Sequence, residues 1–149
     1  MVDTIDRQMR KFFVKSASFR SESRGGVYLI WTDDIEDFYI IKNSLLTYNQ
    51  ICERANTISD ILKQLNNKEK TIKALIIDCP IYDKNEMCSY EKECKYSVEI
   101  IRQQDPLLPM IFYTPNLTCL ISVMEKDPRL IPILKGDTNS LLHALGLKS

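Results

Sequence analysis

Glycine and histidine are scarce in this chain, with four glycines and one histidine among 149 residues. No G-x-x-x-x-G-K-[ST] pattern or other glycine-rich loop follows an apolar run, which argues against a protein that binds a nucleotide through a phosphate loop. His143 lies far along the chain from Cys88 and Cys94, and no C-x-x-C pair occurs. These spacings argue against a zinc site.

Long apolar runs and an excess of one charge are also absent. No segment approaches the ~18 apolar residues that cross a bilayer, and the N-terminus lacks the apolar core of a secretory signal. Basic and acidic residues number 20 each, so we expect neither a nucleic-acid partner nor a membrane partner. The five cysteines are an odd number, which favours reduced thiols and a cytoplasmic location.

Residues 1–25 are expected to form an N-terminal arm and linker, and residues 26–149 to form one domain. The arm holds six basic and three acidic residues, with apolar side chains at helical spacing. These apolar residues are Ile5, Met9, Phe12 and Phe13. The arm is either an additional helix that packs on the domain or a segment that binds a partner or a second copy of the chain. The polar, glycine-containing residues 21–26 indicate a linker.

Five short apolar runs alternate with segments of helical periodicity. The expected strands are residues 27–32, 48–55 with its centre at 50–53, 73–78, 108–114 and 130–134. The expected helices are residues 35–46, 57–65, 86–104, 115–124 and 138–145. This alternation predicts an α/β fold, a doubly wound five-stranded parallel sheet with helices on both faces. Pro132 places the last strand at an edge, and Leu46 is expected to face the core beside Leu45.

Polar residues stand where four of these strands end. Asp33 and Asp34 follow the first strand, Asp78 ends the third, Thr114 ends the fourth, and Lys135 follows the fifth. In open α/β sheets, ligands bind at the carboxyl ends of the strands, so these groups are expected to share one edge. Asp34 also suits the N-cap of the helix that follows it.

These residue types suit phosphoryl chemistry. Three nearby carboxylates repel one another unless a cation joins them, and Mg²⁺ is a hard ion that takes oxygen ligands. An aspartate that retains its negative charge can act as a nucleophile toward phosphorus. An ammonium and a hydroxyl, from Lys135 and Thr114, would hold the phosphoryl oxygens.

From about Val27 to Leu147, the chain resembles the receiver domains of two-component response regulators. The resemblance depends on an ordered set of strand ends: Leu29 to Asp34, Ala74 to Asp78, Ile111 to Thr114, and Ile133 to Lys135. It implies a receiver, or flavodoxin-like, fold. It also implies that Asp78 is the phosphoacceptor and that Thr114 and Lys135 contact the phosphoryl group. By the same resemblance, the Mg²⁺ ligands are Asp33, Asp34, Asp78 and the backbone carbonyl of Pro80.

The function implied is that of a stand-alone receiver-like protein in a two-component phosphorelay. A histidine kinase or phosphotransfer protein would supply the phosphoryl group, and the output would be contact with a downstream protein. Only 14 residues follow Lys135, so no output domain is expected. Any catalysis would be limited to phosphotransfer onto Asp78 and its hydrolysis, and an independent enzyme activity is not expected.

Several positions depart from the family pattern. Pro80 and Pro115 stand where backbone N–H groups help to hold the phosphoryl oxygens, and proline has no N–H. Pro132 replaces an aromatic residue, Gly136 replaces a proline, and Tyr82 replaces another proline. These departures leave open a degenerate receiver that acts as a phosphorylation-independent interaction scaffold. A small flavodoxin-like enzyme is a third interpretation.

Overall fold

The structure is a computed structural model, and it describes residues 26–79, 87–115, 117, 121–127 and 129–148. The N-terminal arm lies outside the described residues. So do Pro80 and Tyr82, two of the positions that depart from the receiver pattern.

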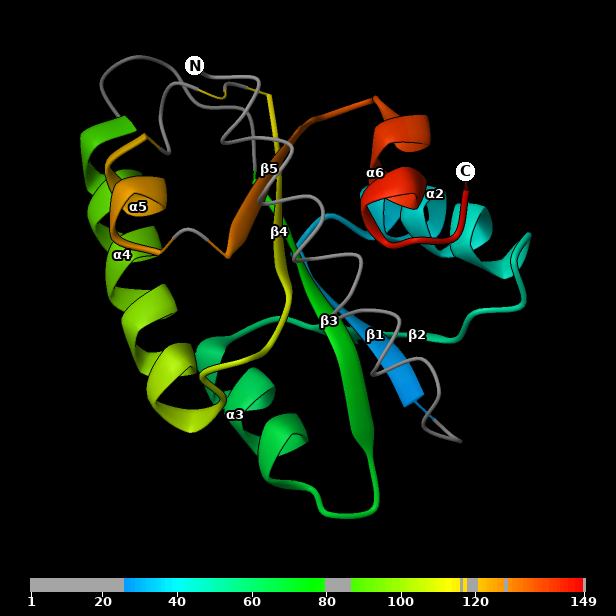
Figure 1. Ribbon diagram of the computed structural model, residues 1–149, viewed down its shortest axis with the longest axis horizontal. Helices are drawn as coiled ribbons and strands as arrows, with labels where there is room; N and C mark the ends of the chain where they lie inside the picture. Colours follow the sequence, from blue (N-terminus) through cyan, green and yellow to red (C-terminus); the bar gives the residue numbers. More distant parts are fainter. Residues whose placement is uncertain (1–25, 80–86, 116, 118–120, 128, 149) are drawn as a thin grey trace.

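One sheet of five parallel strands forms the centre of the domain (Figure 1). The strands are β1 (Gly26–Trp31), β2 (Cys52–Ala55), β3 (Thr71–Asp78), β4 (Met110–Thr114) and β5 (Leu130–Leu134). Their order is β2-β1-β3-β4-β5, so β3 is central and β5 lies at an edge, as its proline predicts. Strand β2 occupies the second half of the expected range of residues 48–55.

The helices cover the sheet in two layers, as the alternating sequence predicts. They are α2 (Ile35–Leu46), α3 (Ile58–Asn66), α4 (Met87–Gln104), α5 (Ile121–Lys126) and α6 (Thr138–Ala144). Figure 1 shows α2 and α6 together on one face of the sheet and α3, α4 and α5 on the other. The expected doubly wound α/β fold is therefore confirmed.

Strand β3 is buried on both faces, and its alternating side chains enter two separate cores. Ala74 and Ile76 pack with the residues of α2 and α6, whereas Leu75 and Ile77 pack with those of α3 and α4. All four side chains are buried. A continuous apolar run suits this position because each face of a parallel sheet is covered by helices. The central strand is thus fixed in register, and Asp78 at its end has a defined position.

Side chains cap the helices that follow β1, β2 and β5. Asp34, Thr57 and Asp137 accept hydrogen bonds from backbone N–H groups in the first turn of α2, α3 and α6 respectively. Such caps satisfy N–H groups that have no partner inside the helix. The first turn of α2 is therefore held firmly at the edge where β1 ends.

The expectation that Leu46 faces the core is wrong. Phe38, Ile41 and Leu45 of α2 are buried, but the Leu46 side chain is 48% exposed. Leu46 lies about 100° around the helix from Leu45, outside the apolar stripe defined by the other three residues. Within the described part of the chain, no helix is both long and apolar enough to cross a membrane.

Candidate functional site

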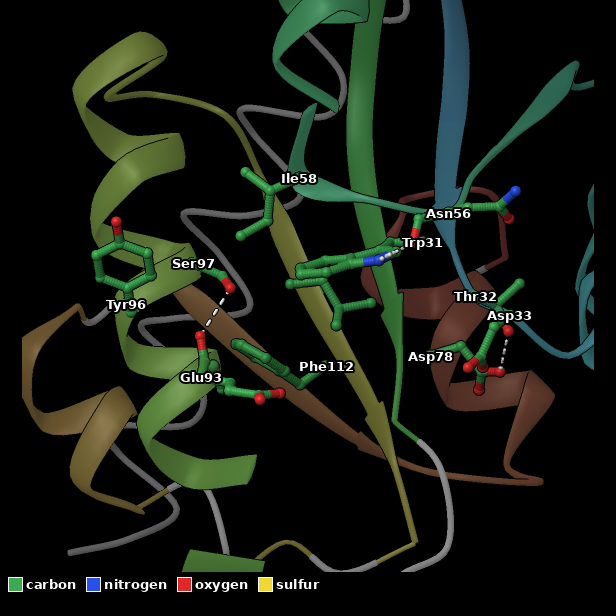
Figure 2. Close-up of a pocket in the computed structure, with 12 residues that line it drawn as sticks. Trp31, Thr32, Asp33, Asn56, Ile58, Asp78, Glu93, Tyr96, Ser97 and Phe112 are labelled. Atoms are coloured by element: carbon green, nitrogen blue, oxygen red, sulfur yellow. Dashed lines mark hydrogen bonds between the residues drawn. The ribbon is translucent and has the colours of Figure 1, made fainter. Parts of the chain in front are cut away.

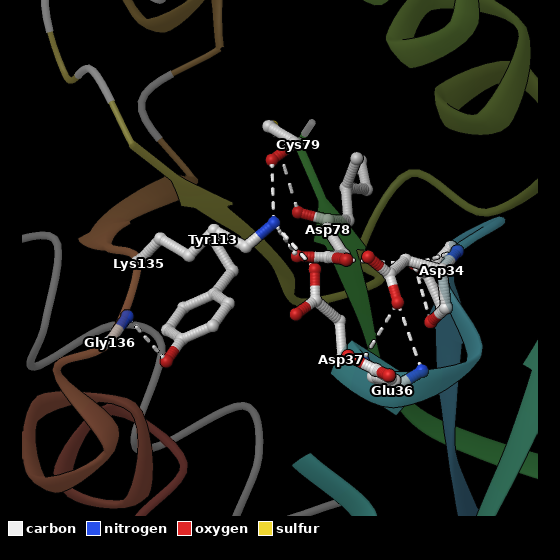
Figure 3. Close-up of polar contacts among 10 residues, drawn as sticks. Asp34, Glu36, Asp37, Asp78, Cys79, Tyr113, Lys135 and Gly136 are labelled. Atoms are coloured by element: carbon white, nitrogen blue, oxygen red, sulfur yellow. Dashed lines mark hydrogen bonds and ion pairs between the residues drawn. The ribbon is translucent and has the colours of Figure 1, made fainter. Parts of the chain in front are cut away.

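Asp78 is a nearly buried carboxylate at the end of the central strand (Figure 3). Its Oδ2 atom accepts a 2.7 Å hydrogen bond from the Thr32 hydroxyl. Its Oδ1 atom lies 3.0 Å from Nζ of Lys135. This second contact is an ion pair whose geometry falls outside that of a hydrogen bond, and no other described residue donates to Oδ1. The carboxylate is thus held on one oxygen by a hydroxyl and on the other by charge.

Thr32 reaches Asp78 because of the register between β1 and β3. Trp31 pairs with Ile77, so the next residue of each strand end, Thr32 and Asp78, lies beside the other. Both side chains are buried. Sequence reasoning did not assign Thr32 to the site, because a threonine that ends a β-prone run is ordinary in a strand. The strand register was the missing information.

Lys135 connects three parts of the edge. Its Nζ atom lies 2.7 Å from Asp37 Oδ2, in addition to its ion pair with Asp78. Nζ also donates a 3.1 Å hydrogen bond to the carbonyl oxygen of Cys79. The structure therefore brings Lys135 and Asp78 together, as the order of the strand ends predicted.

Asp37 was not expected in the site. It belongs to the first turn of α2, where an acidic residue is commonly explained by the helix dipole. The Asp34 cap fixes this turn, and the loop after β5 brings Lys135 to it. The pairing joins segments about a hundred residues apart, and the local sequence carries no signal for it.

The acid pair after β1 is exposed to solvent. Asp34 Oδ1 accepts hydrogen bonds from the N–H groups of Glu36 and Asp37, at 2.9 and 3.2 Å, so its capping role is observed. Among the described residues, no group of three acidic, cysteine or histidine side chains is arranged to hold a metal ion. The assignment of Asp33, Asp34 and Asp78 as Mg²⁺ ligands stays a prediction. The Pro80 carbonyl, the remaining expected ligand, lies outside the described residues.

Thr114 is buried at the end of β4, the strand next to Asp78. The residue in register with Asp78 is Tyr113, whose ring packs in the core beneath α2 and α6. Because side chains alternate along a strand, Thr114 projects toward the opposite face. Its carbonyl accepts a 2.7 Å hydrogen bond from the N–H of Lys135, which links the ends of β4 and β5.

The turn after Lys135 explains one departure from the receiver pattern. Gly136 has φ of +97°, a conformation that proline cannot adopt and that glycine adopts readily. The Gly136 N–H donates a 2.7 Å hydrogen bond to the Tyr113 hydroxyl, and proline has no such donor. A proline at this position is therefore incompatible with the observed turn. The two other described prolines of this pattern are both half-buried. Pro115 directly follows Thr114, and Pro132 lies in β5 opposite Phe112.

The pKa of Asp78 is raised to about 6, chiefly because burial penalises its charge. The hydrogen bond from Thr32 and the charge of Lys135 lower it, while Asp37 raises it. Burial also acts to raise the pKa of Asp37, but contact with the Lys135 ammonium outweighs it and the pKa is lowered. For Lys135, burial is outweighed by the two carboxylates, and the pKa is raised. Lys135 therefore keeps its positive charge and offsets the negative charges of both Asp37 and Asp78.

A surface cavity of about 350 Å³ opens beside Asp78, on the side of α3 and α4 (Figure 2). Its lining includes the acidic residues Asp33, Asp78 and Glu93 and the aromatic residues Trp31 and Phe112. The Trp31 indole donates a 3.2 Å hydrogen bond to the Asn56 carbonyl, which fixes the ring over the end of the sheet. Asp33 and Asp78 thus both line this space, although only 2% of the Asp78 side chain is exposed.

Comparison with known proteins gives matches to solved structures. No protein-family model matches the chain, and no curated protein matches it. A response regulator receiver protein from Sinorhizobium medicae WSM419 matches with a TM-score of 0.57 and 14% identity, over 81% of this chain and 90% of that one. A protein from Burkholderia pseudomallei K96243, described as pilus assembly-related, matches with a TM-score of 0.54 and 14% identity, over 84% of this chain and 92% of that one. The chain therefore has the fold of response regulator receiver domains, as its ordered strand ends predicted.

Proposed function

We propose that this chain is a cytoplasmic receiver-like signalling protein that accepts a phosphoryl group on Asp78. A phosphohistidine of a histidine kinase or phosphotransfer protein is the proposed donor, and a downstream protein reads the phosphorylated form. The observation that carries the proposal is the setting of Asp78. Its carboxylate ends the central strand between the Thr32 hydroxyl and the Lys135 ammonium, beside a cavity open to solvent.

The proposed reaction is an in-line displacement at phosphorus. Oδ1 of Asp78 attacks the phosphorus atom, a new P–O bond forms, and the P–N bond to the donor imidazole breaks. The imidazole nitrogen keeps the electron pair of that bond. Thr32 orients the carboxylate through Oδ2, and Oδ1 receives no hydrogen bond from the described residues that would occupy its lone pairs. Lys135 lies where it can offset the charge that the phosphoryl group adds.

We propose that a Mg²⁺ ion binds at this edge with carboxylate ligands. Asp33 and Asp34 are exposed at the end of β1, Asp33 faces the same cavity as Asp78, and all offer the hard oxygen ligands that Mg²⁺ takes. Asp34 uses one oxygen in its helix cap, and its other oxygen is outside that cap. A bound ion would neutralise part of the charge on the carboxylates and the phosphoryl oxygens.

Proline next to the site removes a hydrogen-bond donor, so we expect the phosphoryl group to be held less firmly than in a site with a full set of N–H donors. Pro115 follows Thr114 and provides no N–H group there. Each missing charge-assisted hydrogen bond removes about 1.5–3 kcal/mol of support. We therefore propose a phosphorylated state that depends mainly on Mg²⁺ and Lys135.

An interaction scaffold that works without phosphorylation is not favoured. Burying the Asp78 charge is unfavourable, and its pKa of about 6 reflects that penalty. A scaffold has no need for a buried carboxylate at this position, whereas a phosphoacceptor needs a carboxylate that is held in place. The burial of Asp78 beside Thr32 and Lys135 therefore favours a reaction at Asp78 over a scaffold role.

Beryllofluoride, which binds aspartate as a phosphoryl analogue, provides the test. In NMR titrations with Mg²⁺, we expect shifts for the backbone signals of Thr32, Thr114 and Lys135, and no shifts after chelation of the metal. Asp78→Asn should abolish the response. Glu99→Gln, which removes an exposed carboxylate from α4, should leave it unchanged. A response that persists in Asp78→Asn would refute the proposed function.

A further inference from the structure

The Lys135 ammonium has two anionic partners, and the nearer one is not the proposed phosphoacceptor. Nζ lies 2.7 Å from Asp37 Oδ2 and 3.0 Å from Asp78 Oδ1 (Figure 3). The Cys79 carbonyl accepts its hydrogen bond. Lys135 is therefore divided between the first turn of α2 and the end of β3.

This arrangement is shielded from solvent. The side chains of Lys135 and Asp37 are 18% and 22% exposed, and that of Asp78 is 2% exposed. Charges in such a setting interact more strongly than on an open surface. The cluster carries one positive and two negative charges, so a group that adds negative charge at Asp78 meets an unfavourable potential.

Asp37 is also rigidly placed. Its N–H donates to the Asp34 cap, and the positive end of the α2 dipole favours a negative charge in this turn. Asp37 therefore stays charged and stays near Lys135 while Asp78 changes its state. Asp33 and Asp34, by contrast, are exposed, and among the described residues neither forms an ion pair with Lys135.

We propose that Asp37 competes with the phosphoryl group on Asp78 for the Lys135 ammonium and so limits the stability of the phosphorylated form. This inference rests on the proposed function of Asp78. A phosphoryl group replaces one carboxylate charge by a larger negative charge. That charge is best stabilised when the Lys135 ammonium pairs with the phosphoryl oxygens alone. Asp37 withholds part of that positive charge and adds its own repulsion. It acts as a regulatory residue of the site through Lys135.

The test compares two neutral substitutions in the same helical turn. Asp37→Asn removes the competing charge, whereas Glu36→Gln removes an exposed charge that has no ion pair with Lys135 among the described contacts. With Mg²⁺ present, we expect Asp37→Asn to bind beryllofluoride about tenfold more tightly than the wild type. Glu36→Gln should stay within about twofold of the wild type. Asp37→Ser provides a second neutral variant if Asp37→Asn folds poorly.

The role of Lys135 is tested by repeating the comparison in a Lys135→Gln background. Without the ammonium there is nothing to compete for, so the gain from Asp37→Asn should fall to less than half in logarithmic terms. An undiminished gain, or equal or weaker binding by Asp37→Asn in the wild-type background, would overturn the inference while leaving the proposed function standing. If neither the wild type nor any variant binds beryllofluoride, both fail.

Discussion

The Thr32 hydroxyl donates a 2.7 Å hydrogen bond to Asp78 Oδ2, and both side chains are buried. The same Thr32 oxygen accepts a 3.0 Å hydrogen bond from the N–H of Asp34. One hydroxyl thus links the proposed phosphoacceptor to the acid pair that is expected to bind the metal. This link orients the carboxylate and leaves Oδ1 toward Lys135.

Removing that hydroxyl should raise the pKa of Asp78 further. Thr32→Val keeps the shape of the side chain but deletes the hydrogen bond, which favours the charged carboxylate. A hydrogen bond to a charged group contributes about 1.5–3 kcal/mol, so we expect the midpoint to rise by about one pH unit or more. Carboxyl ¹³C NMR in the presence of a chelator measures it. Thr32→Ser, which keeps the hydroxyl, should change the midpoint little, and equal midpoints in both variants would contradict this role of Thr32.

The reactivity of Asp78 should follow its own ionisation. Burial raises its pKa to about 6, so in the metal-free protein the nucleophilic carboxylate is the minor form below that pH. Because protons compete with Mg²⁺ for this carboxylate, we expect the initial rate of phosphorylation by a small-molecule donor, at a fixed and sub-saturating Mg²⁺ concentration, to rise from pH 5 to pH 7 and then to level off. The donor's own hydrolysis is measured in parallel at each pH as the control. A rate that is flat across this range would show that Asp78 is fully ionised throughout it.

The charge on Asp78 should also destabilise the fold above that pKa. Because the folded-state pKa lies above the model value of 3.8, the native protein binds a proton more tightly than the unfolded chain between pH 4 and pH 6. Stability contributed by this group is therefore lost as pH rises through that window. Asp78→Asn should be more stable than the wild type by about 1–3 kcal/mol at pH 7.5 and nearly equal to it at pH 4.

Urea unfolding at the two pH values measures this difference. In the variant, Lys135 still has Asp37 as its partner, and the new amide oxygen can accept from Thr32, so no buried charge is orphaned. A variant that is less stable than the wild type at pH 7.5 would show that Asp78 contributes favourably as an anion.

Removing Lys135 should have the opposite effect. Lys135→Met leaves the charges of Asp37 and Asp78 without their cation, and loss of one partner of a fully buried pair costs about 3–5 kcal/mol. Lys135 and Asp37 are partly exposed, so we expect a loss of about 2–3 kcal/mol at pH 7.5. The double variant Lys135→Met/Asp78→Asn should recover at least half of it. Additive effects in this double-mutant cycle would contradict the coupling between Lys135 and Asp78.

Much of the fold was predictable because local patterns agree with one another. The apolar run ending at Asp78 is a strand buried on both faces, and the proline of β5 correctly marks an edge. The meeting of Asp78 and Lys135 was predictable as well. Parallel strands deliver their carboxyl ends to one edge, so the order of residues along the chain is enough to bring them together.

The finer contacts depend on register and on helix placement, which a single sequence does not specify. Thr32 reaches Asp78 because Trp31 pairs with Ile77, and Asp37 reaches Lys135 because the capped first turn of α2 meets the loop after β5. The two uses of Asp34, as helix cap and as metal ligand, also look alike in sequence, since aspartate suits both. Only the cap is observed.

Phosphorylation of Asp78 is the central claim, and mass spectrometry of the intact protein tests it most directly. Incubation with a phosphorylated histidine kinase or a small-molecule phosphoryl donor and Mg²⁺ should add the mass of one phosphoryl group. The modification should be labile to hydroxylamine, absent after chelation of Mg²⁺, absent in Asp78→Asn and retained in Glu99→Gln. A phosphoryl group that still forms in Asp78→Asn, or a wild-type protein that no donor modifies, would contradict the account.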